Sequence, residues 1–219
     1  MENKNEDLRF MQLRFIGKIL AGFTHEIKNH LAIVKESAGL MGDMIKIGKT
    51  VENDSSQYLE IIRSIEEQIE KAIVHFTYLN RFSHRMDTEL STFNVNETLE
   101  ELIALVTRFA NQRKISIEKD FQKDISSINN NPSIFQLLVF YLIEEQLTRL
   151  DINSRLILKT ETANGSIAIR IIPKGKVLDA DREEGSVSNE IREDIIKYLG
   201  GNLSISKEGI VIKLQIKPL

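Results

Sequence analysis

The chain has no cysteine among its 219 residues. This absence excludes a disulfide framework, a thiol nucleophile and a thiolate metal site. Its four histidines are scattered along the sequence and do not have the spacing of a zinc motif. We therefore predict no metal site in this chain.

Long apolar runs and an excess of positive charge are also lacking. No apolar segment approaches the roughly 18 residues of a membrane span, and the N-terminus MENKNEDLRF is polar and acidic. The 29 Lys+Arg and 32 Asp+Glu are interspersed and give a formal net charge of −3, which argues against nucleic acid as a partner. We expect a folded cytoplasmic protein with no membrane span.

Glycine and proline are unevenly distributed, and their absence marks a helical N-terminal part. Residues 49–164 contain no glycine, and the first 90 residues contain no proline. Apolar residues recur at steps of three and four from 16 to 45 and again from 58 to 86, with a polar segment at 49–56 between them. This spacing predicts two long amphipathic helices joined as a hairpin. Because a lone hairpin leaves part of its apolar surface uncovered, we expect a homodimer that closes a four-helix bundle.

Shorter elements follow residue 90. Helix spacing begins after Asn96, taken as the N-cap, and again after Asn131-Pro132. Alternating strands are expected at 115–118, 156–158, 167–171, 203–205 and 210–216, and a further helix at 189–199. The predicted fold class is α+β: a dimerising helical hairpin in residues 1–90, then an α/β sandwich in residues 91–219 with a mixed sheet backed by about three helices.

His25 lies nearly opposite the apolar stripe of the first helix, at about 100° per residue. Its imidazole should therefore point to solvent, where it is a competent nucleophile near neutral pH. Glu26 follows it and is expected to hydrogen-bond one ring nitrogen and fix the tautomer. Asn29 lies one turn further along the same face. Gly17 and Gly22 lower the helix propensity here, which a purely structural helix would not need.

The segment Phe23-Thr24-His25-Glu26-Ile27-Lys28-Asn29-His30-Leu31 resembles the phosphoacceptor box of bacterial sensor histidine kinases. It departs from that box at His30, where the family usually has proline. The resemblance implies that His25 is phosphorylated on a ring nitrogen, that Glu26 is the neighbouring acid or base, and that Asn29 orients a water that hydrolyses a partner's aspartyl phosphate. It also implies that residues 91–219 occupy the place of the family's ATP-binding domain.

The nucleotide motifs of that domain are missing from this sequence. The two metal-binding asparagines of the family's helix correspond to Phe140 and Glu144, and the adenine-binding Asp falls at Pro173. The phosphate lid, at 183–189, has one glycine, and no Gly-x-Gly occurs in the chain. A loop that cradles phosphates with backbone N–H groups usually needs such glycines. We therefore expect no nucleotide cofactor to bind here.

Together these features are similar to histidine phosphotransferases that pair a histidine hairpin with a degenerate ATPase-like domain. The resemblance implies that His25 carries a phosphoryl group between aspartates of response-regulator receiver domains, with Mg²⁺ held by the receiver. Alternatives are a divergent but active ATP-dependent histidine kinase, a non-catalytic adaptor that binds response regulators, and a response-regulator phosphatase using Glu26 and Asn29.

Overall fold

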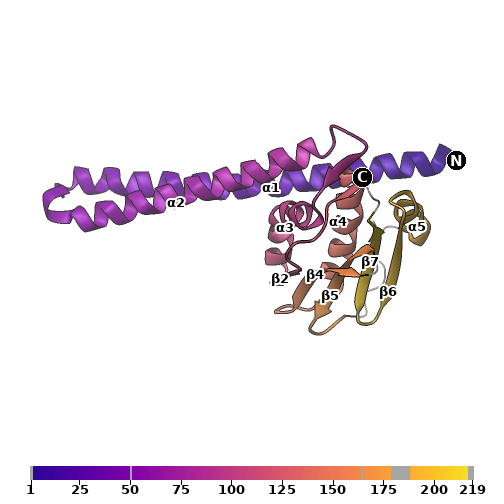
Figure 1. Ribbon diagram of the computed structural model, residues 1–219. Coiled ribbons are helices and arrows are strands. Elements are labelled where there is room, and N and C mark those ends of the chain that lie inside the picture. The colour runs from indigo at the N-terminus through magenta and orange to yellow at the C-terminus, as the bar shows by residue number, and fades with distance from the viewer. Residues whose placement is uncertain (1, 50, 164, 179–187, 217–219) are drawn as a thin grey trace.

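The hairpin predicted from the sequence is present. The computed structural model describes residues 2–49, 51–163, 165–178 and 188–216. Two long antiparallel helices, α1 (Glu2–Lys46) and α2 (Val51–His84), extend well beyond the rest of the molecule (Figure 1). Gly48 adopts a positive φ of 81° in the turn between them, a conformation that glycine reaches without steric cost. None of the helices in these ranges is long and apolar enough to cross a membrane.

The two helices pack on each other unevenly along their length. Near the turn, Met44, Tyr58 and Ile61 form a small buried cluster. Elsewhere several apolar side chains of the predicted stripes remain exposed in a single chain, among them Leu20, Leu31, Ile62, Ile69 and Phe76. One chain therefore buries only part of the apolar surface that the sequence pattern provides.

The remaining elements form an α/β sandwich, as the sequence predicts. They are β1 (Ser91–Phe93), α3 (Val95–Gln112), β2 (Ser116–Phe121), β3 (Ile128–Asn130), α4 (Pro132–Arg149), β4 (Arg155–Ala163), β5 (Ser166–Lys174), α5 (Asn189–Tyr198), β6 (Gly201–Ser206) and β7 (Gly209–Gln215). The main sheet has the order β2-β4-β5-β7-β6, in which β2 and β4 are parallel and the other pairs antiparallel. Helices α3, α4 and α5 lie along this sheet (Figure 1).

Local details differ from the sequence prediction. The N-cap of α3 is Asn94 rather than Asn96, because the Asn94 side chain accepts hydrogen bonds from the backbone N–H groups of Asn96 and Glu97. Strands β1 and β3 pair antiparallel in a second, two-stranded sheet that the sequence did not indicate. The segment between β4 and β5 lies partly outside the described residues, and its Gly165 has a positive φ of 71°.

One core joins the base of the hairpin to the sandwich. Phe15 of α1 is 3% exposed, and its ring centroid lies 5.3 Å from that of Phe82 on α2 and 4.8 Å from that of Phe140 on α4. This contact explains why α1 begins at Glu2 instead of near Ile16: its first turns bury Met11 and Phe15 against the sandwich. A buried ion pair adds to it, because Arg85, just after α2, holds Glu101 of α3 at 2.9 Å.

We expect Phe15→Ala to lower the free energy of unfolding by about 3–5 kcal/mol, since it removes a buried aromatic ring and leaves a cavity among three helices. The measurement is urea denaturation followed by circular dichroism. Leu13→Ala on the same helix is the control, because Leu13 is 70% exposed and its loss should change stability by less than about 0.5 kcal/mol. Equal effects of the two substitutions would contradict the shared core.

Candidate functional site

His25 is exposed on α1, as its position opposite the apolar stripe predicts. Its neighbour one turn along the helix is Asn29, whose Nδ2 lies 3.2 Å from the imidazole Nδ1. The i and i+4 positions of a helix bring two side chains together on one face. The structure therefore places Asn29 directly on the ring of the candidate phosphoacceptor.

This contact decides which ring nitrogen of His25 carries the proton. With Nδ2 of Asn29 donating to Nδ1, the neutral imidazole is protonated on Nε2. A 180° rotation of the amide places its oxygen against Nδ1 instead, so that Nδ1 donates and Nε2 has a free lone pair. Asn29 is thus placed to control the nucleophilic nitrogen, a role that the sequence analysis gave to Glu26.

Glu26 points toward the sandwich instead of toward the His25 ring. Its Oε1 lies 3.4 Å from Nε of Arg108 on α3, and both side chains are largely buried at this contact. The expectation that Glu26 fixes the His25 tautomer is therefore wrong for this structure. Arg108 was missed by the sequence analysis because nothing in a single sequence shows that α3 docks against this turn of α1.

Gly22 has a packing role that the sequence analysis did not anticipate. A Cβ atom at this position would lie 3.3 Å from the Phe109 ring of α3, closer than ordinary van der Waals contact. Gly22 therefore lets α3 approach α1 one turn before His25. Its presence does not by itself indicate catalysis. Gly17 has no atom within 4 Å of such a Cβ.

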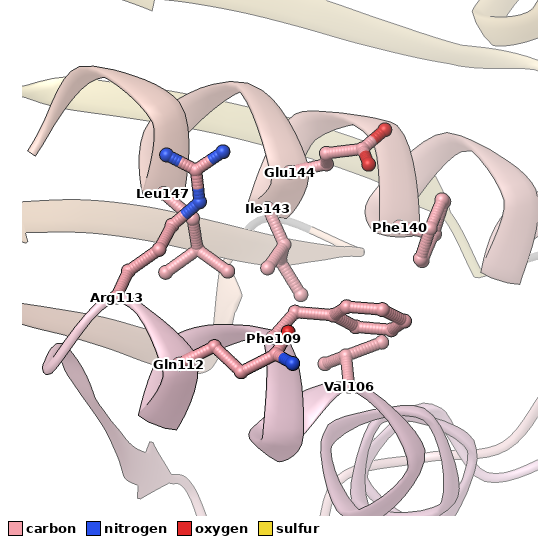
Figure 2. Close-up of a pocket in the computed structure, with 8 residues that line it drawn as sticks. All are labelled: Val106, Phe109, Gln112, Arg113, Phe140, Ile143, Glu144 and Leu147. Carbon is pink, nitrogen blue, oxygen red and sulfur yellow. The ribbon is translucent and has the colours of Figure 1, made fainter. Parts of the chain in front are cut away.

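The face of α4 that carries Phe140 and Glu144 is turned toward the hairpin. Phe140 packs against Phe15, and Glu144 forms an ion pair with Lys18 of α1. Figure 2 shows both residues beside a cavity of about 340 Å³ between α3 and α4, with Phe109 and Arg113 on its other side.

The neighbouring positions Tyr141 and Glu145 occupy other faces of α4. Glu145 lies 2.6 Å from Arg192 of α5, and Arg192 is buried. The Tyr141 hydroxyl donates a hydrogen bond of 3.0 Å to the backbone carbonyl of Met11 on α1. Between α4 and α5, the carboxylate of Glu145 is therefore paired with an arginine.

The end of β5 has a glycine that its backbone requires, and it lacks the adenine-binding Asp of the family. Gly175 has a positive φ of 134°, and a Cβ there would collide with Ser154, so only glycine fits. Pro173, at the position of the adenine-binding Asp, has no carboxylate and pairs with Leu156 of β4. Most of the predicted lid at 183–189 lies outside the described residues.

Comparisons with known proteins agree with this architecture. No protein-family model matches the chain. It is 28% identical over 219 residues to sporulation kinase E of Bacillus subtilis (93% of this chain, 26% of that protein). It is 27% identical over 203 residues to the C4-dicarboxylate transport sensor protein DctB of Rhizobium meliloti (90% of this chain, 31% of that protein). The chain thus spans about a quarter to a third of the length of these relatives.

Among solved structures, the catalytic domain of histidine kinase ThkA superposes with a TM-score of 0.51 at 14% identity, covering 60% of this chain and all of that one. This likeness shows that the sandwich has the fold of a histidine kinase ATP-binding domain. The sequence relatives extend over hairpin and sandwich together. They support the resemblance to the sensor histidine kinase core.

The contact between Tyr141 and α1 makes a pH-dependent contribution to stability. Burial raises the pKa of Tyr141 from 10.0 to about 12, opposed by the charge of Arg14 and assisted by that of Glu144. The neutral phenol contributes its full stability below pH 10, and this contribution is lost as the pH rises toward 12, since the unfolded chain deprotonates first.

We expect Tyr141→Phe to reduce the loss of unfolding free energy at alkaline pH. Between pH 9 and pH 11 the original chain should lose about 1 kcal/mol more stability than the variant, measured by urea denaturation at each pH. Tyr78→Phe is the control, because Tyr78 is a phenol of α2 that lies outside this contact. Parallel stability–pH curves for the original chain and Tyr141→Phe would contradict the assignment.

Proposed function

We propose that this chain carries a phosphoryl group on His25 and passes it to or from the aspartate of a response-regulator receiver domain, as part of a two-component system. The observation that carries the proposal is the exposed imidazole of His25 with Asn29 on its Nδ1. The names of the sequence relatives, a sporulation kinase and a transport sensor, support the same signalling class.

The chemistry requires little covalent help from the protein. With the amide of Asn29 rotated so that its oxygen accepts from Nδ1–H, the Nε2 lone pair attacks phosphorus in line, the bond from phosphorus to the leaving carboxylate or diphosphate oxygen breaks, and the Nδ1 proton leaves to a base. The protein has to align the ring and leave its outer nitrogen accessible. An exposed His25 oriented by Asn29 meets both requirements.

The source of the phosphoryl group separates two candidate functions. The sequence relatives favour ATP, because sporulation kinase E is named as a kinase and matches over hairpin and sandwich. That candidate is a divergent, ATP-dependent sensor histidine kinase. It requires a nucleotide to bind beside α4 without the family's asparagines and without an Asp at position 173.

Two features of the sandwich favour a receiver's aspartyl phosphate instead, which makes the chain a phosphotransferase. The Glu145–Arg192 pair stands between α4 and α5. In addition, Tyr141 contacts α1 at Met11, which precedes His25 by fourteen residues, or about 21 Å along a helix. A nucleotide at this side of α4 would be far from His25 of the same chain unless the sandwich moved.

A homodimer is the proposed assembly. It is supported by the apolar side chains that α1 and α2 leave exposed in one chain, including Leu31, Ile69 and Ile73. Pairing of two hairpins would remove this surface from water and close a four-helix bundle.

The test of the phosphoryl source is labelling of the purified chain in two parallel reactions, one with labelled ATP and Mg²⁺ and one with a labelled, phosphorylated receiver domain. We expect acid-labile label on His25, absent from His25→Ala and retained in His84→Ala, whose exposed imidazole on α2 is bonded to Asp87. Label from the receiver alone identifies a phosphotransferase, and label from ATP a kinase.

Other outcomes oppose the proposal. An absence of label in both reactions, across a panel of receivers, favours the adaptor. Loss of the receiver's phosphate that persists in His25→Ala and stops in Asn29→Ala favours the phosphatase, because that reaction needs an oriented water and no phosphohistidine.

The dimer is tested by sedimentation. We expect Ile69→Asp, which places a charge on a side chain that is 47% exposed in one chain, to shift the protein to the monomer, since a buried unpaired carboxylate opposes association. Ile152→Asp makes the same exchange on the sandwich at a residue that is 59% exposed, and it should leave the mass unchanged. A monomeric original chain would contradict the proposed assembly.

A further inference from the structure

Three metal-ligating side chains meet between α1 and α2 beside the turn that carries His25. Glu26 and His30 lie four residues apart on α1 and therefore share a face. His75 of α2 lies opposite, with its ring centroid 5.4 Å from that of His30. One donor atom from each of the three residues lies within 4.8 Å of the other two. His30 stands where the family resembled by this segment usually has proline.

The hydrogen bonds of both imidazoles put the proton on Nδ1 and leave the lone pair of Nε2 available to a metal. Nδ1 of His75 lies 2.9 Å from the backbone carbonyl oxygen of Lys71, which can only accept, so Nδ1 carries the proton. Nδ1 of His30 lies 2.8 Å from Oε1 of Gln68, and with this orientation of the amide Nδ1 of His30 donates as well. Metal-binding histidines typically donate their second N–H to an oxygen in this way.

The remaining nitrogen of His30 lacks a partner. Its Nε2 is buried and makes no hydrogen bond to the described residues. A buried polar atom without a partner costs free energy, and such atoms are rare in folded proteins. A cation between His30, His75 and Glu26 would supply the missing interaction.

Glu26 completes the set with a carboxylate that is already held in place. Arg108 of α3 contacts its Oε1 at 3.4 Å, which restricts the orientation of the group as an outer-shell partner does. Two imidazoles and one carboxylate suit Zn²⁺ and leave a fourth position for water. Tetrahedral Zn²⁺ needs donors about 3.3 Å apart, so donor atoms that lie within 4.8 Å of one another would have to move closer by up to about 1.5 Å.

We propose that Glu26, His30 and His75 form a binding site for a transition-metal dication, with Zn²⁺ as the preferred ion. The ion links α1 to α2 and takes up the carboxylate of Glu26. The regulatory consequence rests on the proposed function: the ion would fix the turn of α1 that carries His25, because Glu26 and His30 lie one and five residues after it, so bound metal slows phosphoryl transfer at His25.

Binding is tested on the full chain after treatment with chelator, by isothermal titration with ZnCl₂. We expect one ion per chain and an affinity that falls at least tenfold in His30→Ala and in His75→Ala. Gln68→Ala, which removes the oxygen that orients His30, should weaken binding by roughly tenfold. His84→Ala and His25→Ala are the controls, since each removes an imidazole outside the set and should keep the original affinity.

Co²⁺ provides a second measurement that does not depend on affinity alone. A four-coordinate site gives intense visible absorption, which we expect in the original chain and expect to lose in His75→Ala. Circular dichroism of each variant excludes misfolding as the cause. Original affinity in both His30→Ala and His75→Ala, or loss of binding in His25→Ala, would overturn the site.

The regulatory consequence has its own readout. For the original chain and for His75→Ala, the rate of labelling of His25 is compared with and without Zn²⁺, each against its own metal-free rate. A decrease of at least fivefold in the original chain alone is expected. Zinc binding without any labelling of His25 refutes the proposed function and leaves the site standing. Labelling without zinc binding refutes the site and leaves the function standing.

Discussion

The packing of Phe15 between Phe82 and Phe140 is the contact on which the arrangement of this molecule depends. It brings one ring from each of α1, α2 and α4 into a single core, so the base of the hairpin and the sandwich cannot separate without exposing all three to water. The first turns of α1 are helical because they have this surface to cover. An isolated helix end of that composition would fray.

Contacts on both sides of Phe15 follow from that packing. Toward the N-terminus, Met11 accepts the hydrogen bond of Tyr141. Toward the C-terminus, Lys18 pairs with Glu144, Gly22 admits Phe109, and Glu26 reaches Arg108. These contacts succeed one another along about four turns of α1. The side chain next to His25 is thus held by the sandwich, while His25 itself stays exposed.

Sequence periodicity was sufficient to predict the long helices and the main sheet. It did not predict features that depend on tertiary contacts. The spacing of apolar residues gave two long helices and a mixed sheet with three helices because a helix face or strand face is a local property of the chain. It also placed His25 on the exposed face. The start of α1, the Asn94 cap and the strands β1 and β3 were missed, since each depends on tertiary contacts that no local pattern reports.

The candidate sites show the same division between local and long-range information. Asn29 could be placed beside His25 from helix geometry alone. The partner of Glu26 could not, and neither could the meeting of His30 with His75, which requires the register of α1 against α2 across the hairpin. The partners of the two carboxylates of α4 were likewise beyond a local pattern: Glu144 pairs with Lys18 of α1 and Glu145 with Arg192 of α5.

The two proposed routes of phosphoryl transfer place different demands on the packing of the sandwich against the hairpin. An ATP-dependent route would need the core around Phe15 to open, or a second chain to present its sandwich, because Tyr141 is held against Met11 of α1. Opening would also release Glu26 from Arg108. A receiver-dependent route needs neither change, since a receiver domain can approach His25 from solvent. In the phosphoryl transfer proposed above, the strength of one aromatic contact would therefore set which source the chain accepts, without any change to the residues around His25.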